Sequence, residues 1–408
     1  MIHVALLGFG TVGSGTAEVL TSNKSMIESY VGDKINIKYI LDLREFPDSP
    51  FADRIVHDFN IILNDPEVSL VAEMMGGAHP AYDFSKAALE AGKHVVTSNK
   101  EVVATFGIEL LKLATEHGVR YLFEASVGGG IPVIRPLMND FNSNSILSID
   151  GILNGTTNYM LTKMKDEGLA FDTVLRDAQQ KGYAEKNPDA DIKGKDAARK
   201  IVILAALAYG KLISPEDIYT EGITEISDIA TTLATQMGYS IKLIGHTERL
   251  DDGRVLAMVS PRLIPPTNPL SHITDVFNGI LVETDMLGTT MFYGRGAGKL
   301  PTAGAVVADI LDMARRPEEA NTLSWIAATP DDLAPMSDYV CRHFLIVSDP
   351  SGNLDRDTLR GVFGEIKQVI RTDGMVAFIT SAMSEESISK KLADTDRIIF
   401  SHIRVLGE

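Results

Sequence analysis

The residues best suited to chemistry lie between positions 178 and 200, in the stretch AQQKGYAEKNPDADIKGKDAARK. Four carboxylates, those of Glu185, Asp189, Asp191 and Asp196, crowd a loop that glycine and proline interrupt before a helix begins. Asp196 and Lys200 are at positions i and i+4, so they share one face of that helix. This spacing predicts a carboxylate and an ammonium group held side by side.

Lys200 is predicted to point along the buried side of its helix. The apolar residues that continue its face are Ile203, Leu204 and Leu207. A buried lysine needs a partner, and burial can shift its pKa into the range used for proton transfer. The same spacing also suits an ordinary helix salt bridge worth about 0.3–0.5 kcal/mol. Spacing alone does not separate these two interpretations.

Asn99 and Lys100 are a second candidate pair, in the stretch VVTSNKEVVA. They follow a short apolar strand, at the edge where open α/β sheets bind their ligands. A lysine there could polarise a carbonyl group or bind a carboxylate. The alternative is a helix-capping asparagine followed by a surface lysine.

Glu124 opens a third candidate stretch, FEASVGGGIPVIRP. One carboxylate beside glycines with accessible carbonyl groups is an all-oxygen environment, which suits a hard cation, and so few charges suit a monovalent ion. The simpler interpretation is a glycine-rich turn before a helix with Pro132 in its first turn.

These side chains need a scaffold, and the sequence HVALLGFGTVGSGTAEVL at residues 3–20 predicts one. Gly8, Gly10 and Gly13 lie between an apolar strand and a helix, in the order of a Rossmann unit. Gly8 would permit the tight turn, Gly10 the approach of a pyrophosphate to the helix N-terminus, and Gly13 close packing of helix on strand. A glycine turn without a ligand remains the alternative.

The second strand ends near Asp42, which could accept hydrogen bonds from ribose hydroxyls and so favour NAD. Arg44 could instead meet the 2′-phosphate of NADP, and both residues could equally be solvated loop charges. A second glycine-rich loop, GRGAGKLPT at 294–302, could cover the cofactor or act as a hinge.

Hydrophobic periodicity predicts an α/β protein of several parts. Residues 1–138 alternate strands and helices as a doubly wound parallel sheet, which a helix at about 302–318 completes. Residues 139–301 mix helices and strands in an α+β arrangement. Residues 319–338 are polar and proline-marked, as a linker would be. Residues 339–408 follow the order βαββαβ of a ferredoxin-like unit and are expected to fold separately.

Composition narrows the class of protein. The 408 residues carry a net charge of −17, which argues against nucleic acid or an anionic membrane as a partner. The single cysteine excludes an internal disulfide and a cysteine-rich metal site. The N-terminus has no basic signal-peptide start, and the longest apolar stretch is too short for a membrane span. A cytoplasmic protein with a small-molecule substrate is expected.

The sequence resembles the homoserine dehydrogenase family. The long signature of that family is filled without a gap by Ala178, Gly182, Tyr183, Pro188, Asp191, Ile192, Gly194, Asp196 and Lys200. Supporting stretches include GFGTVG, MMGG, VVTSNK, FEASVGGGIP, GILNGTTNY and FYGRGAGKLPTAGAVVAD. The tail resembles an ACT domain, a regulatory module common in the family, although DPSGNL replaces the usual acidic-x-Pro-Gly corner.

The resemblance implies reversible reduction of aspartate 4-semialdehyde to homoserine with NADP or NAD as cofactor, in threonine and methionine biosynthesis. It implies that residues 139–301 bind the substrate and form a homodimer or homotetramer. Lys200 would be the general acid/base, and Lys100 would orient substrate or assist proton transfer. Glu185 would hold the amino group of the substrate, and Asp191 and Asp196 would hold the substrate and Lys200.

The remaining implied contacts fall into three groups. Substrate-pocket positions are Gly155, Thr156 and Tyr183. Cofactor positions are Phe9, Thr11, Val12, Asn99, Lys100 and Gly298, together with Gly8, Gly10 and Gly13 and with Asp42 or Arg44. A sodium site would use Glu124 and the carbonyl groups of Val127, Gly129 and Ile131.

Two other functions remain open at this level. One is a different Rossmann dehydrogenase acting on small amino or keto acids. The other is a non-catalytic NAD(P)-sensing regulator with an amino-acid-binding tail, against which the Asp196/Lys200 and Asn99/Lys100 pairs weigh.

Overall fold

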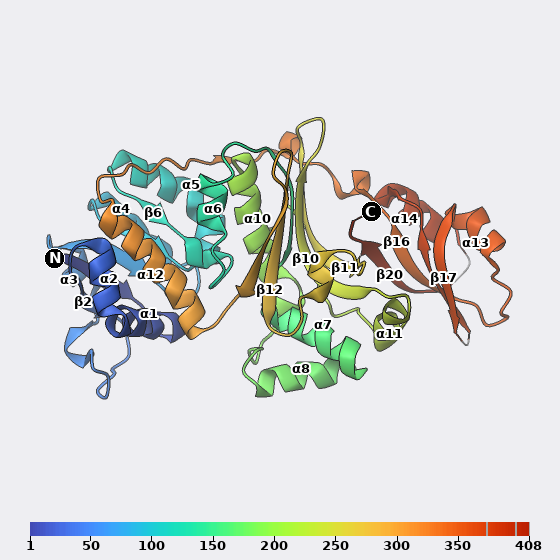
Figure 1. Ribbon diagram of the computed structural model, residues 1–408, viewed down its shortest axis with the longest axis horizontal. Coiled ribbons are helices and arrows are strands. Elements are labelled where there is room, and N and C mark those ends of the chain that lie inside the picture. Colours follow the sequence, from blue (N-terminus) through green and yellow to red (C-terminus); the bar gives the residue numbers. More distant parts are fainter. Residues whose placement is uncertain (373, 396–397, 408) are drawn as a thin grey trace. The chain divides into compact units, whose positions relative to one another are not determined.

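The computed structural model describes residues 1–372, 374–395 and 398–407, and the chain divides into two compact units (Figure 1). The first unit consists of Met1–Ser145, Val202–Ser214 and Phe292–Ala328. The second consists of Ile146–Ile201, Pro215–Met291 and Thr329–Glu408. Each unit is described by itself.

The first unit contains a sheet of six parallel strands in the order β3-β2-β1-β4-β5-β6. The strands are β1 (Ile2–Leu7), β2 (Ile35–Leu41), β3 (Ile55–Val56), β4 (Val68–Glu73), β5 (His94–Thr97) and β6 (Tyr121–Leu122). This is the strand order of doubly wound dinucleotide-binding folds. Strands β2 and β3 lie on one side of β1, and β4 to β6 lie on the other, so the order of addition changes between β1 and β4. The predicted parallel sheet is therefore confirmed.

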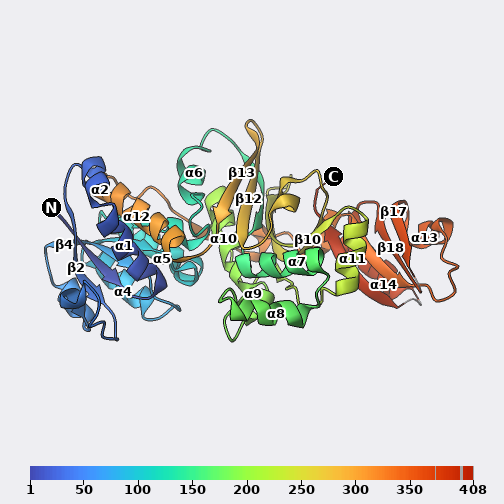
Figure 2. The same ribbon diagram turned by 60° about the horizontal axis from the view of Figure 1, so that its bottom comes forward.

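Helices from distant parts of the chain cover this sheet. They are α1 (Thr11–Ser22), α2 (Lys24–Val31), α3 (Phe59–Leu63), α4 (Ala81–Glu90), α5 (Lys100–Glu116), α6 (Ile134–Asn139) and α12 (Lys299–Arg315). Helix α12 lies beside α1 in both views, although almost 300 residues separate them (Figures 1 and 2). Val306 and Ile310 of α12 are fully buried in one core with Val4 and Leu6 of β1.

The second sheet has the order β13-β12-β7-β10-β11-β20-β16-β18-β17, with β9 (Tyr219–Thr220) paired to β11. Its strands before residue 300 are β7 (Ile146–Ile152), β10 (Ser240–Arg249), β11 (Val255–Ile264), β12 (Phe277–Thr284) and β13 (Gly288–Arg295). The helices of this region are α7 (Gly155–Glu167), α8 (Phe171–Gln180), α9 (Asp189–Ile192), α10 (Lys195–Tyr209) and α11 (Asp228–Gln236).

The C-terminal segment has the element order that the sequence predicts. Its main elements are β16 (His343–Ser348), α13 (Arg356–Phe363), β17 (Ile366–Thr372), β18 (Met375–Thr380), α14 (Glu385–Ala393) and β20 (Ile399–Val405). The four strands are antiparallel in the order β20-β16-β18-β17, the arrangement of a split β-α-β fold.

This segment does not form a compact unit of its own. Strand β20 pairs in parallel with β11, and the segment belongs to the same unit as the middle region. Arg404 of β20 forms a fork with the Glu385 carboxylate at 2.8 and 2.9 Å and also meets Glu221 at 2.8 Å. Arg262 of β11 is fully buried and donates to the Tyr339 hydroxyl at 2.6 Å. Hydrophobic patterning predicted the strand but could not predict its distant partner.

The region predicted as a linker, 319–338, is mostly exposed, with Trp325 and Ala334 as its buried residues. A Cβ atom added to Gly107 would lie 2.8 Å from the Trp325 ring. Short strand β14 (Ile326–Ala327) pairs with β8 (Lys211–Leu212). None of the helices in the described parts of the chain combines the length and hydrophobicity needed to cross a membrane.

Candidate active site

The first glycine loop joins β1 to α1 and has the geometry of a phosphate cradle. Gly8 has φ +90°, in the left-handed region that favours glycine. A Cβ atom on Gly13 would lie 1.9 Å from the Gly8 carbonyl oxygen, so only glycine allows this packing of helix on strand. Gly10 is the N-cap of α1, no side chain caps that helix end, and a Cβ atom on Gly10 would meet only the Arg44 guanidinium, at 4.0 Å. The backbone N–H groups there can receive a pyrophosphate.

Asp42 and Arg44 form one interacting group at the end of β2. The Asp42 carboxylate accepts from the Phe9 N–H at 2.8 Å and from the Arg44 guanidinium at 2.9 and 3.0 Å. Hydrogen bonding from Arg44 lowers the pKa of Asp42 well below its usual value. Arg44 is exposed, whereas the Phe9 ring is buried against Phe46 and Phe51. Of these two charged groups, Arg44 is therefore the more accessible to a ligand.

Asn99 and Lys100 lie after β5, on the carboxyl-end edge of the sheet that carries the glycine loop. The Asn99 side chain caps α5 by accepting from the N–H groups of Glu101 and Val102, and it donates to the Gly77 carbonyl at 2.8 Å. Asn99 is 7% exposed, so this helix cap is also part of the interior. Lys100 begins the helix and is half-buried.

A buried carboxylic acid, Glu73, lies at the same edge of the sheet, and the sequence did not single it out. Glu73 ends β4, is fully buried and accepts from the Thr97 hydroxyl at 2.5 Å and the Met75 N–H at 2.7 Å. Thr97 in turn accepts from the Asn99 N–H at 2.9 Å. Burial raises the pKa of Glu73 to about 7.

The second glycine-rich loop packs against two parts of the first unit. A Cβ atom on Gly15 of α1 would lie 2.8 Å from the Lys299 carbonyl oxygen, and one on Gly129 would lie 2.2 Å from that of Gly296. Gly298 has φ +123° and is the N-cap of α12. This loop therefore begins α12 beside the first turns of α1, where Thr11 and Val12 lie.

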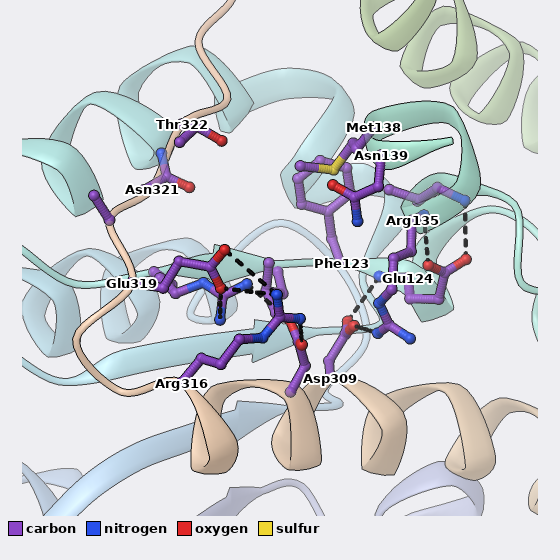
Figure 3. A pocket seen from close by; sticks show the side chains of 15 residues that line it. Phe123, Glu124, Arg135, Met138, Asn139, Asp309, Arg316, Glu319, Asn321 and Thr322 are labelled. Carbon is purple, nitrogen blue, oxygen red and sulfur yellow. Dashed lines mark hydrogen bonds and ion pairs between the residues drawn. The ribbon is translucent and has the colours of Figure 1, made fainter. Parts of the chain in front are cut away.

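Glu124 lies at a small cavity of about 60 Å³ between β6, α6 and α12 (Figure 3). Its carboxylate accepts from the N–H groups of Val133, Ile134 and Arg135 at 2.7 to 2.9 Å. Asp309 of α12 accepts from the Glu124 N–H at 2.8 Å and the Arg135 guanidinium at 2.6 Å. Burial raises the pKa of Asp309 to about 7. A cavity of this size has room for a few water molecules, not for a dinucleotide.

The second unit brings the Lys200 segment together as a buried network. Lys200 is 8% exposed, and its ammonium group donates to Asp196 at 2.8 Å and to the Leu153 carbonyl at 2.7 Å. The Asn154 side-chain amide donates to Asp196 at 2.9 Å and to Asp191 at 2.7 Å. Lys200 is thus buried beside its carboxylate, as its helix position predicted, and not on a solvated face.

The other predicted substrate residues flank the start of α7. Thr156 donates from its hydroxyl group to the Tyr183 carbonyl at 2.6 Å, which ties the loop after α8 to the first turn of α7. A Cβ atom on Gly155 would lie 2.7 Å from the Val276 carbonyl oxygen. Tyr183 and Glu185 are both exposed, and the Tyr183 ring packs edge-on against Tyr159 at 5.0 Å.

Comparison with known proteins connects both regions to one family. A family model described as homoserine dehydrogenase matches residues 132–311, and one described as its NAD binding domain matches residues 8–124. A homoserine dehydrogenase of Synechocystis sp. is 39% identical over 395 residues, which cover 95% of this chain and 88% of that protein.

The chain belongs to the homoserine dehydrogenase family.

Solved structures agree with this assignment. The homoserine dehydrogenase of Thiobacillus denitrificans is 34% identical and superposes with a TM-score of 0.90, covering 99% of this chain and 98% of that one. A hyperthermophilic archaeal homoserine dehydrogenase mutant in complex with NADPH is 27% identical, with a TM-score of 0.67 over 79% of this chain and 99% of that one. As a homoserine dehydrogenase, this chain is an NAD(P)-dependent oxidoreductase, as its sequence predicted.

Three polar residues of this homoserine dehydrogenase were missed by sequence reasoning: Glu73, Asn154 and Asp309. Asn154 carried a signal, because an asparagine before a predicted helix is a usual N-cap. Glu73 and Asp309 carried none, since their partners lie 24 and 185 residues away along the chain.

Proposed function

We propose that this chain catalyses the reversible, NAD(P)H-dependent reduction of L-aspartate 4-semialdehyde to L-homoserine, a step of threonine and methionine biosynthesis. The observation that carries the proposal is the buried Lys200–Asp196 ion pair on the first turns of α10, within a chain of this family. A bound reduced nicotinamide supplies a hydride to the aldehyde carbon, and negative charge then develops on the aldehyde oxygen.

In this proposal Lys200 is the general acid. Its ammonium group gives a proton to the developing alkoxide, and in the reverse direction its amine takes the proton of the hydroxyl group. Asp196 holds the ammonium group at 2.8 Å and favours its charged form. Lys100 has the supporting role of orienting the substrate or assisting proton transfer.

The substrate residues follow from the same assignment. Glu185 is exposed and would hold the amino group of the substrate, and Asp191 would help to hold the substrate. Gly155, Thr156 and Tyr183 would form the pocket wall, since the Thr156–Tyr183 hydrogen bond fixes these segments together.

Cofactor binding is proposed for the first unit. Gly8, Gly10 and Gly13 would place the pyrophosphate at the N-terminus of α1, with Thr11 and Val12 in its first turn. The backbone of Phe9, the exposed Arg44 held by Asp42, and Asn99, Lys100 and Gly298 would complete the surface. Arg44 supports use of NADPH, because a guanidinium can pair with a 2′-phosphate.

We also propose that a sodium ion binds near Glu124. The donor set is all oxygen, and Val127, Gly129 and Ile131 are buried and follow Glu124 within seven residues of the chain, which suits a hard cation. The Glu124 carboxylate already accepts three backbone N–H bonds, so an ion there would share those oxygens and would rely mainly on the carbonyl groups.

The C-terminal segment is proposed to be an ACT-like regulatory module of a homodimeric or homotetrameric, cytoplasmic enzyme. Its split β-α-β topology supports the module. At the altered corner, the buried Asp349 carboxylate accepts from the N–H groups of Asn353 and Leu354, so the loop is organised by its own side chain. Weak or absent inhibition by threonine is therefore expected.

The test is steady-state oxidation of NADPH and of NADH by the purified full chain with aspartate 4-semialdehyde. Turnover with the semialdehyde, and at least about tenfold less with other small keto acids, would support the proposal; a tenfold ratio corresponds to about 1.4 kcal/mol. Cofactor binding without turnover, or preference for another carbonyl substrate, would contradict it.

A further inference from the structure

Asn154 occupies a position between β7 and α7 that couples three charged side chains of the second unit. It is 6% exposed and is the N-cap of α7. Its side-chain oxygen accepts from the Thr157 N–H at 2.9 Å and from the Thr157 hydroxyl at 3.1 Å. Because a backbone N–H can only donate, the atom facing it must be the oxygen. The amide nitrogen therefore faces the opposite way, toward the carboxylates.

Both amide N–H groups are used on charged partners. One donates to Asp191 Oδ1 at 2.7 Å and the other to Asp196 Oδ2 at 2.9 Å. The same oxygen of Asp196 accepts from the Lys200 ammonium group at 2.8 Å. Lys200 also donates to the carbonyl of Leu153, the residue before Asn154. Residues 153 and 154 thus hold Lys200 both directly and through Asp196.

We infer that Asn154 is a positioning residue for the reaction: its amide group holds the two carboxylates together and thereby fixes the ammonium group of Lys200. This inference rests on the proposed role of Lys200. A helix cap alone would accept serine, threonine or aspartate equally well. Only asparagine combines a capping oxygen with two N–H donors in a side chain of this length. The need to donate to two carboxylates therefore explains why asparagine stands here rather than another capping residue.

Each alternative residue makes a distinct prediction. Serine keeps a capping oxygen but removes both N–H donors, which leaves two like charges close together without the amide between them. Aspartate keeps the cap and the volume, removes both donors and adds a third carboxylate. A third negative charge favours the protonated form of its neighbours, so the pH profile of kcat should move to higher pH.

The experiment compares Asn154→Ser and Asn154→Asp with Ser227→Ala in the full chain. Ser227 caps α11 in the same unit by accepting from the Ala230 N–H at 3.1 Å, and its partners there are backbone groups, so it controls for loss of a cap. Asn154→Ser should lower kcat at least about tenfold, raise KM for the semialdehyde and leave the Kd of NADPH unchanged; tenfold corresponds to about 1.4 kcal/mol. Its circular dichroism spectrum at the assay temperature should match that of the wild type, and the kcat of Ser227→Ala should stay normal. Asn154→Asp should show the displaced pH profile.

A parallel Lys200→Ala variant separates the two claims. If Lys200→Ala keeps near-normal kcat, the proposed role of Lys200 fails. If Lys200→Ala loses turnover while Asn154→Ser keeps kcat, KM and an unchanged pH profile, only the Asn154 inference is overturned. A fall in kcat of Asn154→Ser that merely follows its loss of folded protein would also overturn it.

Discussion

Each unit has a helix-capping asparagine near a lysine: Asn99 directly precedes Lys100 in the chain, and Asn154 lies near Lys200. The two caps use their amide donors differently. Asn99 donates to backbone carbonyl groups, and the nearby acid, Glu73, accepts from a hydroxyl and a backbone N–H. Asn154 donates to two carboxylates, one of which is ion-paired with Lys200. The first arrangement fixes the position of the backbone around a buried carboxyl group. The second fixes a charge, which is what a proton-transfer group requires.

The largest expected effect comes from removing residues 335–408, which belong to the second unit and not to the first. Strand β20 pairs with β11, and the buried Arg262 guanidinium would lose the Tyr339 hydroxyl, at a cost of about 1–3 kcal/mol in addition to the exposed apolar surface. Turnover should fall to background while the first unit, whose residues all remain, still binds NADPH. Fluorescence titration of NADPH and a turnover assay check both statements. A truncated chain with normal turnover would show that the segment is independent after all.

A pH-dependent effect is expected in the first unit. Burial raises the pKa of Glu73 from 4.5 to about 7, so the folded state binds this proton more tightly than the unfolded state. The resulting stabilisation is present below pH 4.5 and is lost as the pH rises through about 7; it amounts to about 3 kcal/mol at most. Glu73→Gln should therefore flatten the decline in melting temperature between pH 4.5 and pH 7.

The matched control for Glu73→Gln is Glu116→Gln, an exposed position on α5. Melting curves recorded across this pH range should superimpose in shape for the wild type and this control. An unchanged slope in Glu73→Gln would mean that the buried carboxyl group does not titrate there.

A smaller effect concerns the choice of cofactor. Arg44→Ala should lower kcat/KM with NADPH about tenfold, corresponding to about 1.4 kcal/mol, and change the value with NADH little. Asp42→Ala should shift the ratio toward NADPH, because it removes a negative charge near the 2′-phosphate position. Catalytic efficiencies with both cofactors give the ratio directly. If neither substitution changes it, both residues are only loop charges.

The sequence alone predicted the features that depend on residues close together in the chain. The glycines at 8, 10 and 13 lie within six consecutive residues, so their spacing determines the strand-turn-helix geometry. Likewise Asp196 and Lys200 are i and i+4, and the apolar residues after them predicted burial. The link from Asn154 to these residues spans 37 and 42 positions. Hydrophobic pattern says that a strand forms but not which strand it joins, and so the pairing of β20 with β11 was not predicted.

The central claim is that Lys200 transfers the proton, and the kcat of Lys200→Ala tests it most directly. The control is Lys195→Ala, because Lys195 is exposed at the start of the same helix. With aspartate 4-semialdehyde and NADPH, Lys200→Ala should lower kcat by about 100-fold or more, the scale of general acid catalysis. Its NADPH affinity and circular dichroism spectrum should match those of the wild type, and Lys195→Ala should turn over normally. A kcat for Lys200→Ala within a few-fold of the wild type would contradict the account.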